Sequence, residues 1–345
     1  LNAALRLQFA DTAHFTFSGR LKRRIMPFFT CLSAMNPLNL PPELPIARYR
    51  LHFTLTHDLQ LPPYAASTLR GVFGHALLAA ACTCNTPQTP HLPDCPYAQI
   101  FEPAPCADLP SSVRQSPPPP YLIETPLVAP THFPAGAGYA FDLVLFGRAR
   151  HSLPLIAAVF AQAFAKGLGA NNAGKGELSS IAVQQADGSF LTISERGSPI
   201  ALHDNHIRLP ERYPTQAHIQ LLTPLRIQQK GRILRETELT QAVFLRQLLR
   251  RYLTLAHLHW GNNANAAELS AQIGGQGVPP RLSWHEHRRF SNRQKQITPL
   301  SGAIGTWQLT GLPPAFSQML YIGQWLHLGK ETVFGNGQYR IIQAA

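Results

Sequence analysis

Alternating apolar and polar residues predict strands in both halves of the chain. Residues 47–56 (ARYRLHFTLT) alternate with a period of two and are rich in aromatic and β-branched side chains, which is typical of a half-buried strand. The same pattern recurs at residues 139–146 and 177–184, and residues 217–222 open the second half with another such run. We therefore expect a sheet in each half.

Apolar residues at helical spacing follow these runs. Residues 66–81 and 155–169 predict helices in the first half, and residues 236–260 predict the longest helix of the chain. The second half is completed by three predicted strands and one more helix. These strands cover residues 284–291, 302–310 and 338–342, and the helix covers residues 315–326. The order strand, helix, strand, strand, helix, strand predicts an α+β protein of tandem ferredoxin-like βαββαβ domains, less regular in the first half.

The predicted domain boundaries follow from these runs. A chain of 345 residues, 45% hydrophobic, is long enough for two cores. Residues 1–45 read as a poorly ordered basic and proline-rich extension, residues 46–213 as the N-terminal domain, and residues 214–345 as the C-terminal domain with a glycine-rich loop. Residues 82–120 are rich in proline and cysteine and are expected to be an irregular insertion.

Five cysteines form an odd set without a regular disulfide framework, which favours a reducing, cytoplasmic setting. Cys82 and Cys84 lack the paired C-x2-C spacing of structural zinc sites, although His91 could supply a nitrogen ligand. We predict no metal and no cofactor, and favour scattered thiols. Zinc at Cys82, Cys84, Cys95 and Cys106 stays open.

The chain is strongly basic. Thirty Lys and Arg against eighteen Asp and Glu give a net charge of +12, and an excess of that size points to a polyanion, nucleic acid ahead of membrane. Residues 281–342 concentrate the signal, because basic residues there interleave with aromatic ones that could stack on bases. The basic residues are Arg288, Arg289, Arg293 and Lys295, and the aromatic ones are Trp284 and Phe290. An ordinary basic edge strand is the alternative.

Residues 169–176 (GANNAGKG) imitate a phosphate-binding P-loop. Gly176 stands where Ser or Thr must bind magnesium, and the segment follows a helix instead of leaving a strand. We interpret it as a glycine turn with Lys175 available for an RNA phosphate. A nucleotide-dependent enzyme is the weakest of the functional hypotheses.

Several segments of the second half together resemble a known family. They are TPLRIQQKG (223–231), RRFSNRQ (288–294), SGAIGTWQLTG (301–311) and LHLGKETVFGNGQYRI (326–341). Their order and spacing are similar to the C-terminal domain of the CRISPR-associated endoribonucleases of the Cas6 family, in the repeat-associated mysterious protein superfamily. In the first half, LRGVFGHALL (69–78) and CPYAQIFE (95–102) are similar to segments of one branch of that family.

This resemblance implies tandem ferredoxin-like domains, a glycine-rich loop that contacts RNA, and metal-independent cleavage of CRISPR precursor RNA within its repeats. In that reaction a ribose 2′-OH attacks the adjacent phosphate and leaves a 2′,3′-cyclic phosphate and a 5′-OH. The implied partners are CRISPR repeat RNA and other CRISPR-associated proteins. A catalytically inactive RNA-binding subunit of an effector complex is the alternative.

The reaction needs a base, an acid and positive charge near the phosphate. Because the family often places a histidine on or after its first helix, His75 is the first catalytic candidate, and His327 and Lys330 at the glycine-rich loop come next. His285 and His287 alternate in one predicted strand, but no third metal ligand accompanies them. The expected RNA contacts are Arg70, Lys175, Arg226, Arg288, Arg289, Arg293, Lys295, Gly329, Gly335 and Gly337.

Overall fold

A computed structural model describes most of the chain. The described residues are 37–41, 43–84, 91–203, 207, 209–261, 264–274, 277–291 and 296–344, and they form one compact unit. Most of the predicted extension lies outside them. Its last residues do not behave as an extension, because Leu38, Leu40 and Leu44 are buried in the core of the second half.

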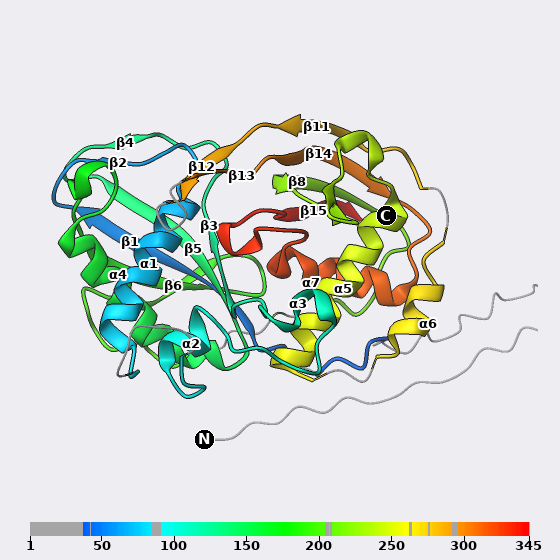
Figure 1. Ribbon diagram of the computed structural model, residues 1–345, viewed down its shortest axis with the longest axis horizontal. Helices are drawn as coiled ribbons and strands as arrows, with labels where there is room; N and C mark the ends of the chain where they lie inside the picture. Colours follow the sequence, from blue (N-terminus) through cyan, green and yellow to red (C-terminus); the bar gives the residue numbers. More distant parts are fainter. Residues whose placement is uncertain are drawn as a thin grey trace, which may run out of the picture. The chain divides into compact units, whose positions relative to one another are not determined.

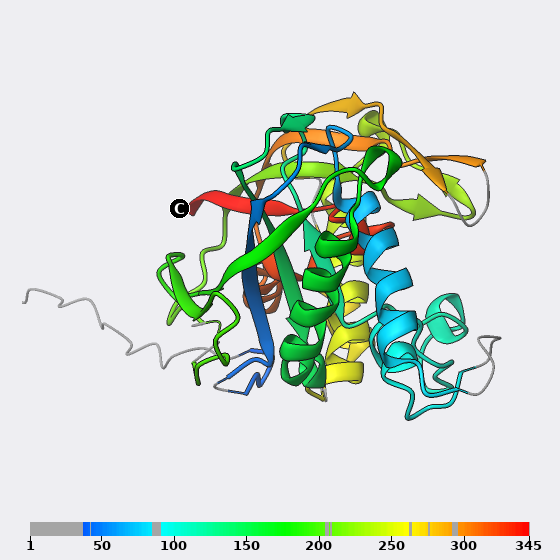
Figure 2. The ribbon, with the colours of Figure 1, turned by 90° about the vertical axis from the view of Figure 1, so that its left-hand side faces the viewer.

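The first sheet has five antiparallel strands in the order β3-β5-β1-β6-β7. They are β1 (Ile46–Leu55), β3 (Tyr121–Glu124), β5 (Gly138–Phe146), β6 (Gly176–Gln184) and β7 (Phe190–Glu195). Helices α1 (Ala66–Ala81) and α4 (Leu153–Lys166) pack against each other on one side of this sheet (Figure 2). Without the edge strand β7, the four remaining strands have the ferredoxin-like order 2-3-1-4.

The second sheet repeats this plan with four antiparallel strands in the order β11-β14-β8-β15 (Figure 1). They are β8 (Ala217–Leu225), β11 (Arg281–His285), β14 (Gly302–Leu309) and β15 (Tyr339–Ala344). Its two long helices are α5 (Gln241–His259) and α7 (Pro314–Leu326), which pack on each other. The predicted α+β fold of tandem ferredoxin-like domains is therefore confirmed, and we call the two halves the first and second units.

Shorter elements connect these strands and helices. In the first unit they are β2 (Leu59–Gln60), α2 (Pro96–Ile100), α3 (Ser111–Arg114), β4 (His132–Phe133), η1 (Gly147–Ser152) and η2 (Ala170–Asn172). In the second unit they are β9 (Gln228–Gln229), β10 (Arg232–Ile233), η3 (Glu236–Glu238), α6 (Ala266–Ala271), β12 (Arg288–Ser291), β13 (Gln296–Pro299) and η4 (Thr332–Phe334). The predicted irregular insertion thus carries two short helices, α2 and α3.

Two predicted boundaries in the second unit are wrong. The strand expected at residues 284–291 is two strands, because β11 ends at His285 and β12 pairs with β13 in a separate two-stranded sheet. Between them, the backbone of His287 bonds to Leu300 and to the Ser301 hydroxyl. The helix expected from residue 236 begins at Gln241, because the Thr240 side chain caps its N-terminus by accepting from the Val243 amide.

The cores of the two units share residues across their boundary. Leu300 and Phe334, from the second unit, are buried in the first core. Leu122, Val144 and Phe146, from the first unit, are buried in the second core. Because each core takes side chains from the other unit, the boundary is a packed interior rather than a hinge.

Candidate functional site

The glycine-rich loop lies between the end of α7 and the start of β15, and its glycines allow it to fold back on the protein. Gly337 has a φ of +73°, and a Cβ there would collide with the Leu328 carbonyl oxygen. Gly329 has a φ of +86°, and a Cβ there would collide with the Arg226 carbonyl. That same Arg226 carbonyl accepts a hydrogen bond from the Lys330 amide at 2.8 Å. These two glycines therefore fix the loop against itself and against the end of β8.

The C-terminal part of the loop packs against the first unit. A Cβ at Gly335 would lie 2.7 Å from both the Ile123 carbonyl and the Tyr64 hydroxyl. That hydroxyl donates to the Phe334 carbonyl. Gly335 and Gly337 are buried, whereas Gly329 is half-buried. The glycines at 335 and 337 thus serve close packing within the protein, and Lys330 is the one exposed residue in the described loop.

A buried polar network holds the start of the loop. Glu124 of β3 is 5% exposed and accepts from Arg48 of β1, with Nε to Oε2 at 2.7 Å and Nη2 to Oε1 at 2.9 Å. His327 at the end of α7 donates from Nε2 to Glu124 Oε1 at 2.7 Å. Arg48 also donates to the Gln324 carbonyl at 3.0 Å. Strands of the first unit and the last turn of α7 are therefore joined by charge-assisted hydrogen bonds.

Electrostatics in this network keep the glutamate charged and the histidine neutral. Burial by itself raises the pKa of Glu124, but the Arg48 charge and the His327 hydrogen bond outweigh it and lower that pKa to about 2. Burial, together with the charges of Arg48 and Arg251, lowers the pKa of His327 although Glu124 raises it. His327 is 0% exposed, so its ring cannot contact an RNA phosphate in this conformation. Its observed contact joins α7 to β3, and its catalytic role stays a prediction.

A basic groove runs beside the exposed part of the loop. It has a volume of about 580 Å³, and its walls are α5, the loop, the turn around Lys230 and residues 112–119. Lys230 and Lys330 are exposed in it, and Arg250 reaches across to donate to the Ser112 hydroxyl at 2.7 Å. One acidic residue, Glu331, also lines it. A groove with this excess of cations suits a phosphate backbone.

A pair of histidines stands where the loop meets the first unit. The rings of His285 and His287 lie 6.4 Å apart, and the His287 ring meets the Tyr64 ring edge-on at 5.2 Å. Burial and the neighbouring His285 lower the pKa of His287. The Arg226 guanidinium donates to the Ser301 carbonyl at 3.0 Å. No third metal-ligating side chain joins the two histidines among the described residues.

The two predicted site residues of helix α1, Arg70 and His75, lie on different faces of the helix. The Arg70 guanidinium lies over the rings of Phe101 at 4.4 Å and Phe334 at 5.0 Å, so it joins α1 to the glycine-rich loop. His75 is exposed and follows the buried Phe73 by two residues, which is about 200° around the helix. The structure thus places His75 on the solvent side of α1, away from the face that carries Arg70. Its catalytic role stays a prediction.

The remaining predicted RNA contacts are placed as follows. Lys175 is half-buried, and its carbonyl accepts from the Thr56 amide at 2.9 Å. Leu168 and Gly174 pair as an isolated bridge, so the glycine segment is a folded-back turn instead of a phosphate cradle. Arg288 and Arg289 lie in β12, opposite Pro299 and Thr298 of β13. The predicted contacts Arg293 and Lys295 lie outside the described residues.

The structure thus combines two ferredoxin-like units, a glycine-rich loop and a basic groove beside that loop, features that suit a polyanionic ligand. Residues 219–339 match the family model described as CRISPR-associated endoribonuclease Cas6. Residues 44–206 match a second model, described as the N-terminal domain AF_1859_N. The resemblance read from the sequence motifs is thereby confirmed, since residues 219–339 are similar to the Cas6 endoribonucleases.

Solved structures share the fold at low identity. A partial Cas6-RT-Cas1–Cas2 complex matches 89% of this chain at 14% identity and a TM-score of 0.55, and the chain spans 48% of that relative. A fuller Cas6-RT-Cas1–Cas2 complex gives the same identity and TM-score, but the chain spans only 30% of it. A product complex of Thermus thermophilus Cas6 matches 88% of this chain and 100% of its own, at 14% identity and a TM-score of 0.50.

Two further comparisons are negative. A search of curated proteins finds no match for the chain. In the described part of the chain, no helix is both long and apolar enough to cross a bilayer.

Proposed function

We propose that this chain is a metal-independent endoribonuclease that cleaves CRISPR precursor RNA within its repeats and so generates mature guide RNAs. The observation that carries the proposal is the basic groove with the glycine-rich loop as one wall and Lys330 exposed at its edge. Repeat RNA is the proposed partner, together with other CRISPR-associated proteins. The cytoplasm, where such transcripts are made, is the proposed location.

The proposed chemistry is an in-line attack within the RNA. A base takes the proton of a ribose 2′-OH, the 2′-oxygen bonds to the adjacent phosphorus, and the bond to the 5′-oxygen breaks as an acid protonates that oxygen. The products are a 2′,3′-cyclic phosphate and a 5′-OH. Lys330 would stabilise the charge on the nonbridging oxygens as a point charge.

His75 is the first candidate for proton transfer, because it is exposed and no side chain covers it one turn earlier, where Gly71 stands. His287 is the second candidate. Its lowered pKa keeps its ring neutral and able to accept a proton near neutral pH. It lies beside Tyr64, which holds the glycine-rich loop.

Cleavage of a repeat transcript in EDTA tests the proposal. The expected products carry a 2′,3′-cyclic phosphate on the upstream fragment and a 5′-OH on the downstream fragment. The ends are identified by phosphatase and kinase treatment before gel analysis. A 3′-OH product, or cleavage that requires added magnesium, would contradict the mechanism. Bound but intact RNA would favour the alternative, an inactive RNA-binding subunit of an effector complex.

Single variants assign the roles. His75→Ala should lower the cleavage rate by at least about 100-fold, as loss of a general acid or base does, with repeat affinity unchanged. His151→Ala, a change at another exposed histidine of the first unit, is the matched control. If His75→Ala cleaves normally and His287→Ala does not, the proton-transfer role passes to His287.

The proposed phosphate contacts have a separate readout. Lys330→Ala and Arg289→Ala should each weaken repeat binding and make its dependence on salt shallower, by about one counterion for each charge removed. Lys166→Ala, at an exposed lysine on the last turn of α4, should leave the salt dependence unchanged. An unchanged slope in the Lys330 variant would mean that this residue does not contact RNA.

A further inference from the structure

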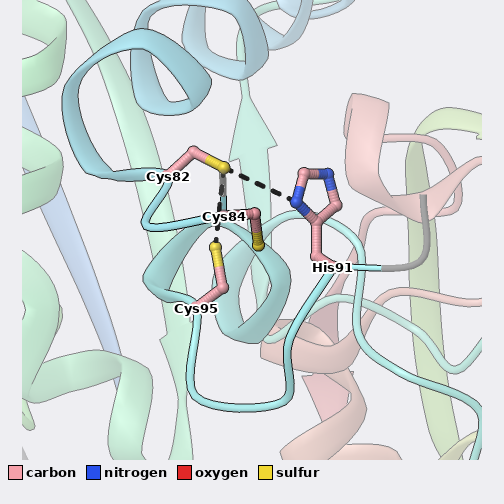
Figure 3. A group of neighbouring side chains, drawn as sticks. All are labelled: Cys82, Cys84, His91 and Cys95. Carbon is pink, nitrogen blue, oxygen red and sulfur yellow. Dashed lines mark hydrogen bonds between the residues drawn. The ribbon is translucent and has the colours of Figure 1, made fainter. Parts of the chain in front are cut away.

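Four side chains of the insertion between α1 and β3 converge on one point, although their spacing in the sequence lacks the paired C-x2-C pattern of structural zinc sites. They are Cys82, Cys84, His91 and Cys95, and their nearest ligand atoms all lie within 4.8 Å of one another (Figure 3). Cys82 follows the last residue of α1, and Cys95 immediately precedes α2. Three separate stretches of the chain therefore deliver a thiol or imidazole to the same place.

Two distances inside this cluster are close to those of a tetrahedral zinc site. Cys82 Sγ lies 3.9 Å from Cys95 Sγ and 3.6 Å from His91 Nδ1. With Zn–S bonds of about 2.3 Å and Zn–N bonds of about 2.0 Å, a tetrahedron separates two sulfurs by about 3.8 Å and a sulfur from a nitrogen by about 3.5 Å. Both observed separations match an edge of that tetrahedron.

A disulfide does not account for the arrangement. Bonded sulfur atoms lie about 2.05 Å apart, whereas Cys82 and Cys95 are separated by 3.9 Å and all four described cysteines are free. A disulfide between any two of these cysteines would also leave one thiol and the imidazole unexplained. Thiolate and imidazole ligands in a tetrahedral set are the combination that zinc prefers.

We propose that Cys82, Cys84, His91 and Cys95 bind one structural zinc ion. Four protein ligands fill a tetrahedral shell and leave no position for substrate, so the site is structural rather than catalytic. Its surroundings support the ligands. The Leu92 amide donates to Cys84 Sγ at 3.3 Å, and the His91 ring packs on the Tyr97 ring with centroids 4.8 Å apart.

Zinc would serve a segment that has few apolar side chains of its own to bury. Leu92, in the middle of the cluster, is 55% exposed. The ion would fix the start of α2, and α2 leads directly to Phe101, whose ring fills the space above Gly74 of α1. The Arg70 guanidinium also lies over the Phe101 ring. By fixing the position of α2 and Phe101, the proposed zinc site would therefore also help to position Arg70 against the glycine-rich loop.

Metal analysis of the purified full chain tests the proposal. We expect about one zinc ion per chain by mass spectrometry of the metal content. Cys84→Ser and His91→Ala should each reduce the content at least fivefold. Cys106→Ser is the matched control, because Cys106 lies in a different group with Asp108 and His257, two exposed residues. Zinc that is lost in the Cys106 variant and kept in the Cys84 variant would overturn the assignment.

Thiol titration of the wild-type protein does not depend on whether the variants fold. With zinc bound, the three ligand thiols should react slowly with a thiol reagent, and a chelator should release zinc and make all three reactive. Protein without zinc whose thiols all react at once would overturn the proposal. So would protein without zinc that gains two thiols on reduction, since that result indicates a disulfide.

Discussion

The buried carboxylate of Glu124 offers the sharpest test of how the two units are joined. Glu124→Gln keeps the size and shape of the side chain and removes its charge. In the folded chain Arg48 would then keep its positive charge with 11% of its side chain exposed, and all of its acceptors, the new amide oxygen and the oxygens of Gln184 and Gln324, would be neutral. An uncompensated charge in such a place is costly.

The size of the effect follows from the pKa. The ordinary pKa of the carboxyl is 4.5, and the network lowers it to about 2. At about 1.36 kcal/mol for each pH unit, the difference corresponds to about 3 kcal/mol of folding free energy. Because the folded pKa is the lower one, this contribution is complete above pH 4.5 and is lost as the pH falls toward 2. Removing one partner of a buried ion pair typically costs about 3 to 5 kcal/mol.

Urea unfolding followed by intrinsic fluorescence measures this cost at neutral pH. We expect Glu124→Gln to lose about 3 kcal/mol, and the stability of the variant to fall less steeply between pH 4.5 and 2. The matched control is Asp142→Asn, because Asp142 makes the same two-bond pair with Arg50 but at 37% exposure of the arginine. The control should lose about 1 kcal/mol or less. Equal losses in the two variants would refute the argument from burial.

Three other predictions concern the same boundary. Burial and the nearby Arg251 lower the pKa of His259 to about 4. The stability that depends on the neutral ring is therefore complete above pH 6.5 and decreases below it, where the unfolded chain takes up a proton. Between pH 7 and 5, the unfolding free energy of the wild type should fall by about 2 kcal/mol more than that of His259→Phe. Gly337→Ala should lower the free energy of unfolding in urea by more than about 2 kcal/mol and weaken RNA binding. Its control is Gly311→Ala, because Gly311 also has a positive φ but no described atom lies within 4 Å of the new Cβ. The control should cost about 1 kcal/mol. Tyr64→Phe removes the hydrogen bond to Phe334, so it should cost about 1 kcal/mol of unfolding free energy and speed RNA release in a filter-binding chase. The reasoning would be contradicted if His259→Phe or Tyr64→Phe behaved like the wild type, or if Gly337→Ala cost no more than Gly311→Ala.

Most of the architecture could be predicted because its strands and helices have clear periodicity. The strand β3 could not. Its four residues are all buried and follow four prolines, so they show neither alternation nor the length that separates a strand from a loop. The split between β11 and β12 was equally hidden, since the bonds from His287 to Leu300 and Ser301 come from a distant part of the sequence.

The site was harder to predict than the fold. The glycine-rich loop was found from its composition, but the reason for its glycines was not, because the groups that crowd Gly335 are Tyr64 and Ile123 of the other unit. The pairing of His327 with Glu124 joins residues 203 positions apart. The spacing of the cysteines does not match the usual zinc motifs, and only the fold shows that His91 and three of the thiols meet.

The seating of the glycine-rich loop also orders events during protein synthesis. Tyr64 bonds to Phe334 across 270 positions of sequence, and Gly335 packs against Ile123. A ribosome-bound chain can complete the first sheet long before the segment around Phe334 exists, since the strands of that sheet all precede residue 196. Until then Tyr64 and β3 lack the loop residues that pack against them. The contact between the glycine-rich loop and the first unit therefore forms late, only after nearly the whole chain has been synthesised.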